Sequence, residues 1–140
     1  MKIDLHIHSK NSDGVLSPEE IFQKAKKNNI SMISITDHDY IENYSDLASK
    51  YDISTVTGIE FNTSYKKMHI LGYGIEDIQL VKKIMNELAM YNEDVVLKVI
   101  QMLERDGFNI SRSKIIAFCK ENNMKHEFLD KKILVKYLIN

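Results

Sequence analysis

The chain has 140 residues, of which 44% are hydrophobic and 28% are charged, and its formal net charge is -1. A chain of this length buries about two thirds of its unfolded surface, so a compact globular fold is expected. The sequence lacks both a long apolar run and a signal peptide, and its single cysteine excludes an internal disulfide; we expect a soluble, cytoplasmic protein without a membrane partner. The scattered lysines and the near-zero charge argue against duplex DNA as a partner.

The chain from Met1 to Glu76 carries alternating signals for strands and helices. Apolar and polar residues alternate from Ile3 to His8, which is typical of a strand. Ser17 and Glu20 form a capping box around Pro18, which predicts the start of a helix. In chain order, the expected elements are a strand at 1–8, a helix at 17–29, a strand at 30–36, a poorly marked helix at 43–50, and strands at 54–61 and 67–73. This order is typical of parallel βαβ units.

Beyond residue 77 the apolar residues recur at helical spacing. The first helical stretch continues to Asp106, and Gly107 is expected to end it. Two more helices are expected, one capped by Ser111 or Ser113 and one over 129–139. We therefore predict an α/β part at residues 1–76 and an all-helical part at 77–140.

Four of the five histidines come before Ile70, each at or near an expected strand end. They are His6, His8, His38 and His69. The carboxyl ends of parallel strands converge at one edge of a sheet, where catalytic groups of such folds gather. That edge also receives the carboxylates Asp37, Asp39 and Glu60. The strand that begins at His69 can reach the same edge if it runs antiparallel to its predecessor.

The combination of imidazoles and carboxylates predicts a metal centre. Such donors suit zinc, manganese or iron, and a bridging carboxylate suits a pair of metal ions. A centre of this kind is well suited to phosphate ester hydrolysis, in which metal ions neutralise the phosphate and a metal-bound hydroxide attacks phosphorus. We expect no serine or cysteine nucleophile.

Five short motifs follow one another between Asp4 and Tyr73. They are Asp4–Ser9 (DLHIHS), Ser12–Gly14 (SDG), Ile35–His38 (ITDH), Gly58–Glu60 (GIE) and His69–Tyr73 (HILGY). In order and approximate spacing these motifs resemble the PHP (polymerase and histidinol phosphatase) family of metal-dependent phosphoesterases. The coincidence of several separate motifs makes the resemblance specific. The HILGY segment is most similar to the branch that acts on nucleoside bisphosphates and RNA 5′ ends.

The resemblance implies a role for each matching residue, with two or three divalent metal ions in all. The first ion would be held by His6, His8 and Glu60, the second by Glu60 and His69, and the third by Asp13 and His38. The catalytic set would be His6, His8, Glu60 and His69. Three further carboxylates would orient the imidazoles as hydrogen-bond partners, namely Asp4, Asp37 and Asp39.

The fold implied by the resemblance is an α/β fold, a distorted β/α barrel present here only in part and followed by an all-helical insertion subdomain. Full-length members of the branch are longer, and their later strands supply another histidine and an Asp-x-His pair. After His69 this chain offers only His126, on a polar segment. The open sheet edge would need cover from the helices, from a second copy in a homo-oligomer, or from a missing C-terminal segment.

Three hypotheses about function follow from these expectations. The first is a metal-dependent phosphoesterase acting on a small phosphorylated substrate, a nucleotide or an RNA end. The second is a catalytically inactive, metal-binding half-barrel that acts as an interaction or regulatory module. The third is a truncated chain that folds only partly until a missing segment is supplied. Metal content and hydrolysis of a phosphate ester distinguish them.

Overall fold

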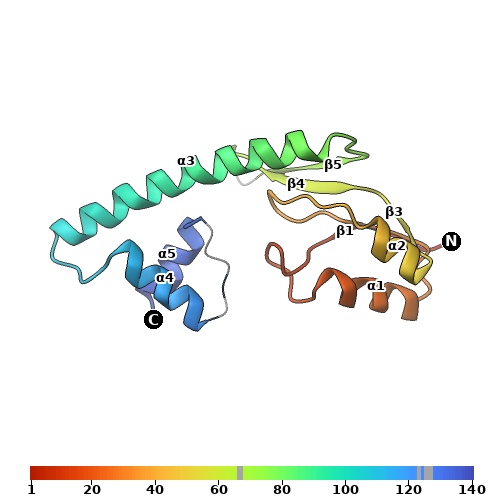
Figure 1. Ribbon diagram of the computed structural model, residues 1–140, viewed down its shortest axis with the longest axis horizontal. Helices are drawn as coiled ribbons and strands as arrows, with labels where there is room; N and C mark the ends of the chain where they lie inside the picture. Colours follow the sequence, from red (N-terminus) through yellow and green to blue (C-terminus); the bar gives the residue numbers. More distant parts are fainter. Residues whose placement is uncertain (66–67, 123, 125–127) are drawn as a thin grey trace. The chain divides into compact units, whose positions relative to one another are not determined.

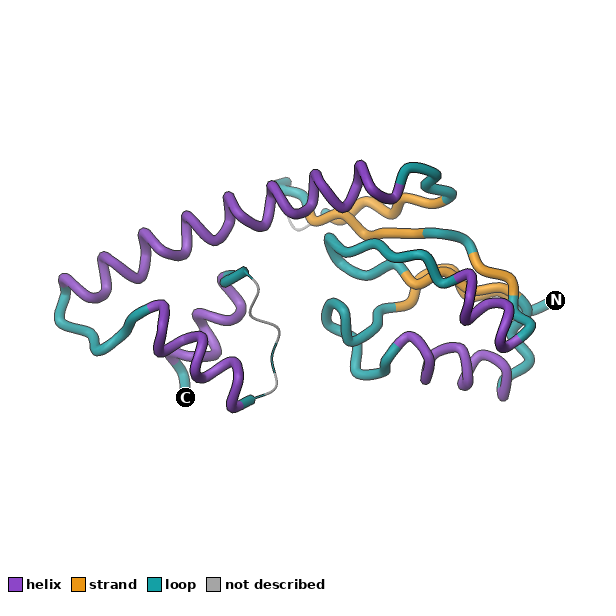
Figure 2. The backbone as a smooth tube through the Cα atoms, viewed as in Figure 1, coloured by secondary structure: helices purple, strands orange, loops and turns teal. Residues whose placement is uncertain are grey.

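The computed structural model describes residues 1–65, 68–122, 124 and 128–140. The chain forms two compact units, Met1–Met85 and Asn86–Asn140, and the division falls inside helix α3 (Ile78–Arg105). Every strand of the described residues belongs to the first unit, and the second unit is helical (Figure 2). The predicted domains at 1–76 and 77–140 use a different boundary and stay a prediction.

The first unit follows the predicted order of strands and helices, as the labels in Figure 1 show. Its elements are β1 (Ile3–Ile7), α1 (Pro18–Lys27), β2 (Met32–Ile35), α2 (Ser45–Tyr51), β3 (Ser54–Thr55), β4 (Gly58–Asn62), β5 (His69–Tyr73) and the start of α3. The strand expected at 54–61 is two strands, because the chain leaves one sheet after Thr55 and enters another at Gly58. The predicted α/β class is confirmed.

The strands of the first unit form two sheets. β1, β2 and β3 are parallel neighbours, whereas β4 and β5 pair antiparallel. The segment that follows β2 contacts the second sheet, since the Glu60 amide donates to the Asp37 carbonyl (3.2 Å) and the Asp39 amide donates to the Glu60 carbonyl (3.0 Å). The Tyr73 hydroxyl of β5 also donates to the Leu5 carbonyl of β1 (2.8 Å). This side-chain contact joins β5, the last strand, to β1, the first, although the two strands belong to different sheets.

The helices α1 and α2 lie side by side on one face of the parallel sheet (Figure 1). The apolar face of α1 buries Ile21, Phe22 and Ala25 against Ile33, Ile35 and Ile53. Full burial of one such large side chain contributes about 1.5 to 3 kcal/mol. The predicted capping box is confirmed, because Ser17 and Glu20 each accept a hydrogen bond from the other's backbone amide.

Three helices end in the same hydrogen-bonded motif. Asn29, Asp52 and Gly107 follow α1, α2 and α3 with φ angles of 56°, 51° and 89°. In each case the next residue's amide donates to the carbonyl five residues before it, as in a Schellman motif. The left-handed backbone at Gly107 confirms the predicted end of the long helix.

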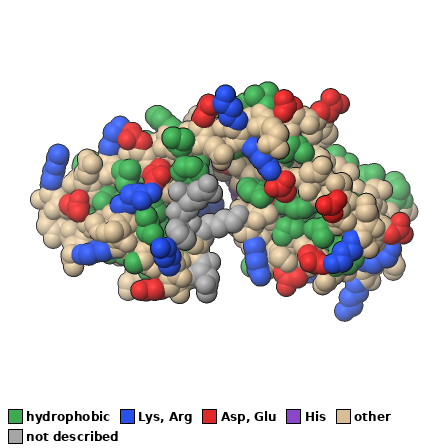
Figure 3. Space-filling model, viewed as in Figure 1, with side chains coloured by type: hydrophobic (Ala, Val, Ile, Leu, Met, Phe, Trp, Pro, Cys, Tyr) green, Lys and Arg blue, Asp and Glu red, His purple; other side chains and the backbone are tan. Residues whose placement is uncertain are grey.

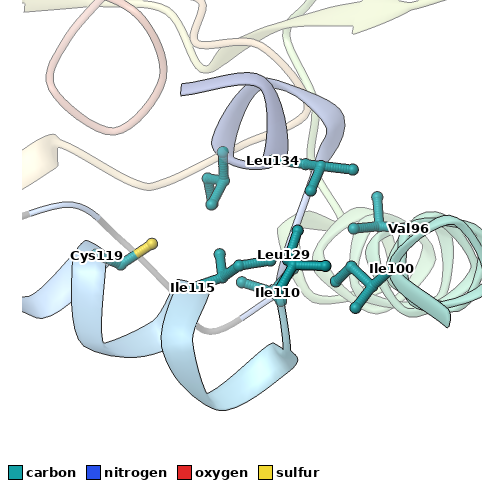
Figure 4. Packing of buried hydrophobic residues seen from close by; sticks show 8 residues of the cluster. Val96, Ile100, Ile110, Ile115, Cys119, Leu129 and Leu134 are labelled. Atoms are coloured by element: carbon teal, nitrogen blue, oxygen red, sulfur yellow. The ribbon is translucent and has the colours of Figure 1, made fainter. Parts of the chain in front are cut away.

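The second unit packs the remainder of α3 against α4 (Arg112–Glu121) and α5 (Lys131–Leu138). Figure 4 shows side chains from all three helices and their connections meeting in one apolar cluster. Its buried members are Val96, Ile100, Ile110, Ile115, Cys119, Leu129, Ile133 and Leu134. Ser111 caps α4, which decides between the two predicted caps, and Asp130 caps α5. His126 lies outside the described residues.

Charged side chains of both signs are interspersed on the face of the molecule drawn in Figure 3. Among the described residues drawn on that face, no patch of a single sign that would suit a nucleic acid duplex is present. Within the described residues, every helix is too short or too polar to cross a membrane.

Candidate metal centre

The chain brings the predicted ligands together from five separate stretches. His6 lies in β1 and His8 directly follows it, Asp13 lies in the loop after β1, and His38 follows β2. Glu60 occupies the middle of β4 and His69 the start of β5. In the β4–β5 register, Glu60 faces Leu71 and Asn62 faces His69, so Glu60 and His69 are diagonal neighbours. β5 runs antiparallel to β4, which is the condition under which His69 could reach this edge.

Three donor atoms converge in the first group. Glu60 Oε2 lies 3.1 Å from His6 Nε2 and 2.9 Å from His8 Nε2, and the two Nε2 atoms lie 3.1 Å apart. These three atoms make three close pairs, but each of the two ring nitrogens carries at most one proton. Hydrogen bonds therefore cannot account for all three contacts. Ligands about 2.1 Å from one ion lie roughly 3.0 to 3.4 Å apart, so the group has the dimensions of a metal site.

Two further groups share residues with the first. Glu60 Oε1 lies 3.1 Å from His69 Nδ1, and Glu60 Oε2 lies 3.7 Å from His38 Nδ1. Asp13 lies 3.3 Å from His8 Nδ1 and 3.8 Å from His38 Nε2. In each of the three groups, one donor atom per residue lies within 4.8 Å of the others. The groups are His6–His8–Glu60, His38–Glu60–His69 and His8–Asp13–His38.

The electrostatics of the centre favour cation binding. Burial raises the pKa of Glu60, but the hydrogen bond from His6 and the charge of His38 outweigh it, so the net pKa is lowered and the carboxylate stays ionised. Burial lowers the pKa of His38, although the charges of Glu60 and Asp13 oppose this shift. Its buried Nδ1 has no hydrogen-bond partner among the described residues. A neutral ring nitrogen that faces a carboxylate without bonding to it is a suitable ligand for a divalent ion.

The centre opens to solvent on one side. The side chains of His6, Asp13 and His69 are 51%, 54% and 38% exposed, whereas that of Glu60 is 8% exposed. Glu60 is therefore the most deeply buried of these four residues, and His6, Asp13 and His69 lie where a substrate could reach them.

All six predicted ligands lie in these three groups, and their assignment to particular ions stays a prediction. The three carboxylates expected to orient imidazoles have other hydrogen-bond partners among the described residues. Asp4 accepts from the His6 backbone amide (3.4 Å), and Asp39 accepts from the backbone and side-chain amides of Asn62. Asp37 accepts from Ser9 and Ser12.

Two residues that the sequence interpretation missed lie beside the centre. Ser9 is fully buried, and the Ser12 hydroxyl lies 3.4 Å from both His8 Nδ1 and Asp13 Oδ1. Serines in a loop are common as turn residues, so their contact with a carboxylate much later in the chain gave no separate signal in the sequence.

Comparison with known proteins gives the family. Residues 4–139 match the family model of the PHP domain. A 5′-3′ exoribonuclease of Haemophilus influenzae is 35% identical over 80 residues, which are 54% of this chain and 29% of that protein. A 3′,5′-nucleoside bisphosphate phosphatase of Chromobacterium violaceum is 34% identical over 79 residues, which are 53% of this chain and 28% of that protein.

Solved structures share the fold. An amidohydrolase from Chromobacterium violaceum, with bound sulfate and no metal, matches with a TM-score of 0.61 and 25% identity over 85% of this chain and 44% of its own. A proposed metal-dependent phosphoesterase from Bifidobacterium adolescentis matches with a TM-score of 0.62 and 18% identity, and that likeness concerns the fold alone. The chain thus spans less than half the length of these two relatives.

Proposed function

Because the chain belongs to the PHP domain family, we propose that it hydrolyses a phosphate ester of a nucleotide or of an RNA end with two or three divalent metal ions. The observation that supports this best is the buried carboxylate of Glu60, whose two oxygens face different imidazoles. Oε2 faces His6 and His8, and Oε1 faces His69. A carboxylate that serves two neighbouring cations is a usual component of phosphoesterase centres.

The residues of the centre would have two roles, which are to bind metal ions and to leave access for a substrate. The nearly buried Glu60 and His38 fix the positions at which cations would bind. His6, Asp13 and His69, whose side chains are more exposed, would complete the binding of these cations and leave them accessible to a phosphate. Divalent ions bound there would neutralise the charge of the phosphate and lower the pKa of a water. Mixed imidazole and carboxylate donors favour zinc, manganese or iron.

The substrate class is proposed from the two curated relatives, an exoribonuclease and a nucleoside bisphosphate phosphatase. We propose a nucleotide or RNA end, with neither duplex DNA nor a membrane as a partner. Residues 1–76 would form the metal-binding part, and the helical residues 77–140 would form a separate subdomain.

The decisive experiment measures metal content and hydrolysis in the same preparation. We expect metal in the purified chain, and hydrolysis of a generic aryl phosphate, a nucleoside 3′,5′-bisphosphate or a 5′-phosphorylated RNA that stops on chelation. Glu60→Gln should remove both, because the amide cannot serve two cations as an anion does. Glu76→Gln, at an exposed position between β5 and α3, is the matched control. Turnover that survives chelation, or that Glu60→Gln leaves intact, contradicts the proposal.

A second candidate function is a metal-binding module without catalytic activity. The observation that favours it is coverage, since the chain spans 44% of the solved amidohydrolase. In that case the chain would bind metal through the same residues and show no turnover with any of the three substrates.

Among the described strands, β1 pairs only with β2, so its other edge is open. We propose that this edge pairs with a second copy of the chain or with an additional C-terminal segment. Either partner could complete a barrel. Sedimentation of the purified chain tests for a homo-oligomer. Hydrolysis that arises only when a C-terminal polypeptide from a longer relative is added would indicate the missing segment.

A further inference from the structure

The carboxylate of Asp37 is buried beside the candidate metal centre and is bound by two serines. Asp37 is 1% exposed. Its Oδ1 accepts from the Ser9 amide (2.6 Å) and the Ser12 hydroxyl (2.7 Å), and its Oδ2 accepts from the Ser9 hydroxyl (2.6 Å). Hydrogen bonds to an ionised acceptor are short and about twice as strong as neutral ones. Asp37 therefore fixes both serines firmly.

The same two serines organise the turn over residues 9–14. The Ser9 carbonyl accepts from the amides of Ser12 (3.1 Å) and Gly14 (2.9 Å), and the Ser9 hydroxyl accepts from the Asn11 amide (3.1 Å). Ser9 is thus the centre of the turn, and its own position is set by Asp37. The hydrogen bond from the Ser12 hydroxyl attaches the turn to Asp37 at a second point.

Asp13 belongs to this turn. Its carboxylate faces His8 Nδ1 (3.3 Å) and His38 Nε2 (3.8 Å), yet its side chain is 54% exposed. An exposed aspartate keeps one orientation only if its backbone is held. Asp37 precedes His38 directly, so the residue that holds the turn and the ring that Asp13 faces lie on one short stretch of chain.

We propose that Asp37 is a positioning residue for the group His8–Asp13–His38. Through Ser9 and Ser12 it holds the turn, and the turn holds Asp13 opposite His38. This role differs from direct orientation of an imidazole, which was the role expected from the family resemblance. The inference deepens the proposed function and rests on it, because it assigns Asp13 to a metal ion.

The test uses Asp37→Asn and Ser12→Ala in the full chain. Asp37→Asn keeps the shape of the side chain but places an N–H group opposite serine donors. Of the hydrogen bonds to Asp37, Ser12→Ala removes only the one from the Ser12 hydroxyl. Asp46→Asn and Ser49→Ala are matched controls at exposed positions of α2. Ser12→Thr restores a hydroxyl and should restore the wild-type result. Asp13→Asn provides the reference for loss of this one ion.

Two measurements are made on each variant. Amide hydrogen exchange at Ser9, Ser12 and Gly14 should become at least tenfold faster in Asp37→Asn, while amides of β2 stay protected. In a manganese titration, Asp37→Asn and Ser12→Ala should reproduce the isotherm of Asp13→Asn, in which one ion binds at least tenfold more weakly and the others bind as in the wild type.

Each outcome decides the inference. If the amides of the turn exchange at the wild-type rate in Asp37→Asn, Asp37 does not stabilise the turn. If they exchange faster but the manganese isotherm is unchanged, Asp37 does not position Asp13. Loss of all ions in Ser12→Ala, with the fold intact, would also contradict a role confined to this group. A wild-type chain that binds no metal contradicts the proposed function, whereas the exchange data on that same sample still decide whether Asp37 holds the turn.

Discussion

Nδ1 of His38 lies 3.7 Å from Oε2 of Glu60, and no hydrogen bond joins the two buried atoms. A buried polar atom left without a partner costs about 1 to 3 kcal/mol. Such atoms are rare in folded proteins and call for a functional explanation. A cation between the nitrogen and the oxygen provides one, because it bonds to both.

Replacement of His38 should affect more of the centre than replacement of His69. His38 belongs to two of the three donor groups and His69 to one. We expect His38→Gln to lose up to two ions per chain and His69→Gln at most one, as measured by elemental analysis after gel filtration. In chelator, His38→Gln should lower the free energy of unfolding by less than about 1 kcal/mol, because Nδ1 has no protein hydrogen bond to lose. A larger loss in chelator would give His38 a structural role instead.

The ion pair between Glu42 and Lys82 should make the stability of the first unit depend on pH. Lys82 Nζ lies 2.8 Å from both carboxylate oxygens, and its hydrogen bond lowers the pKa of Glu42 below the ordinary value of 4.5. A lowered carboxylate pKa contributes stability above the ordinary value, and this contribution is lost as the pH falls through the lowered value.

We expect Glu42→Gln to be less stable than the wild type at pH 6, and this difference in stability to be smaller at pH 3. Glu42 is more than a third exposed, so screening by solvent limits the difference to less than about 1 kcal/mol. Urea unfolding at the two pH values measures it, with Glu87→Gln at an exposed position of α3 as the control. An equal difference at both pH values would show that the ion pair is not the cause.

Gly14 should not tolerate a side chain. A Cβ atom added there would lie 2.1 Å from the carbonyl oxygen of His8, and this obstacle is backbone that cannot rotate away. We expect Gly14→Ala to cost about 1 to 3 kcal/mol, as overpacking does, and to weaken metal binding at Asp13. Gly74→Asn is the control, since nothing lies within 4 Å of that position and asparagine accepts a positive φ. Thermal unfolding and a metal titration would reveal either effect.

The core of the second unit should depend strongly on Ile115, which is fully buried. We expect Ile115→Ala to lower the free energy of unfolding by about 2 to 5 kcal/mol and Ile115→Val by about 0.5 to 1.5 kcal/mol. Val135→Ala, at a position of α5 that is 54% exposed, should change it by less than about 0.5 kcal/mol. Denaturant unfolding that ranks these variants in another order would contradict the packing shown in Figure 4.

The sequence predicted the elements of the first unit because local signals and tertiary contacts agree there. The capping box at Ser17 and the alternation along β1 are local, and both are present in the structure. The division of the strand expected at 54–61 could not be predicted, because it depends on which neighbour each half meets. Ser54 and Thr55 pair with β2, whereas Gly58 to Asn62 pair with β5.

The same distinction applies to the candidate metal centre. The six donors could be found because strand ends converge and because their motifs are specific. The binding of Asp37 to Ser9 and Ser12 could not be found, since a loop serine has no periodicity that points to a distant carboxylate. The role toward an imidazole expected for Asp37 stays a prediction, and its bonds to Ser9 and Ser12 are contacts that the sequence did not predict.

The hydrogen bond from the Tyr73 hydroxyl to the Leu5 carbonyl joins β5 to β1 within the first unit. Every donor of the candidate centre comes before Tyr73 in the sequence. The ribosome therefore finishes all six donor residues of the candidate centre before it makes α4 and α5. Under the proposed function, these donors would be able to bind metal during synthesis, before the second unit is made, and the bound ions would stabilise the nascent first unit.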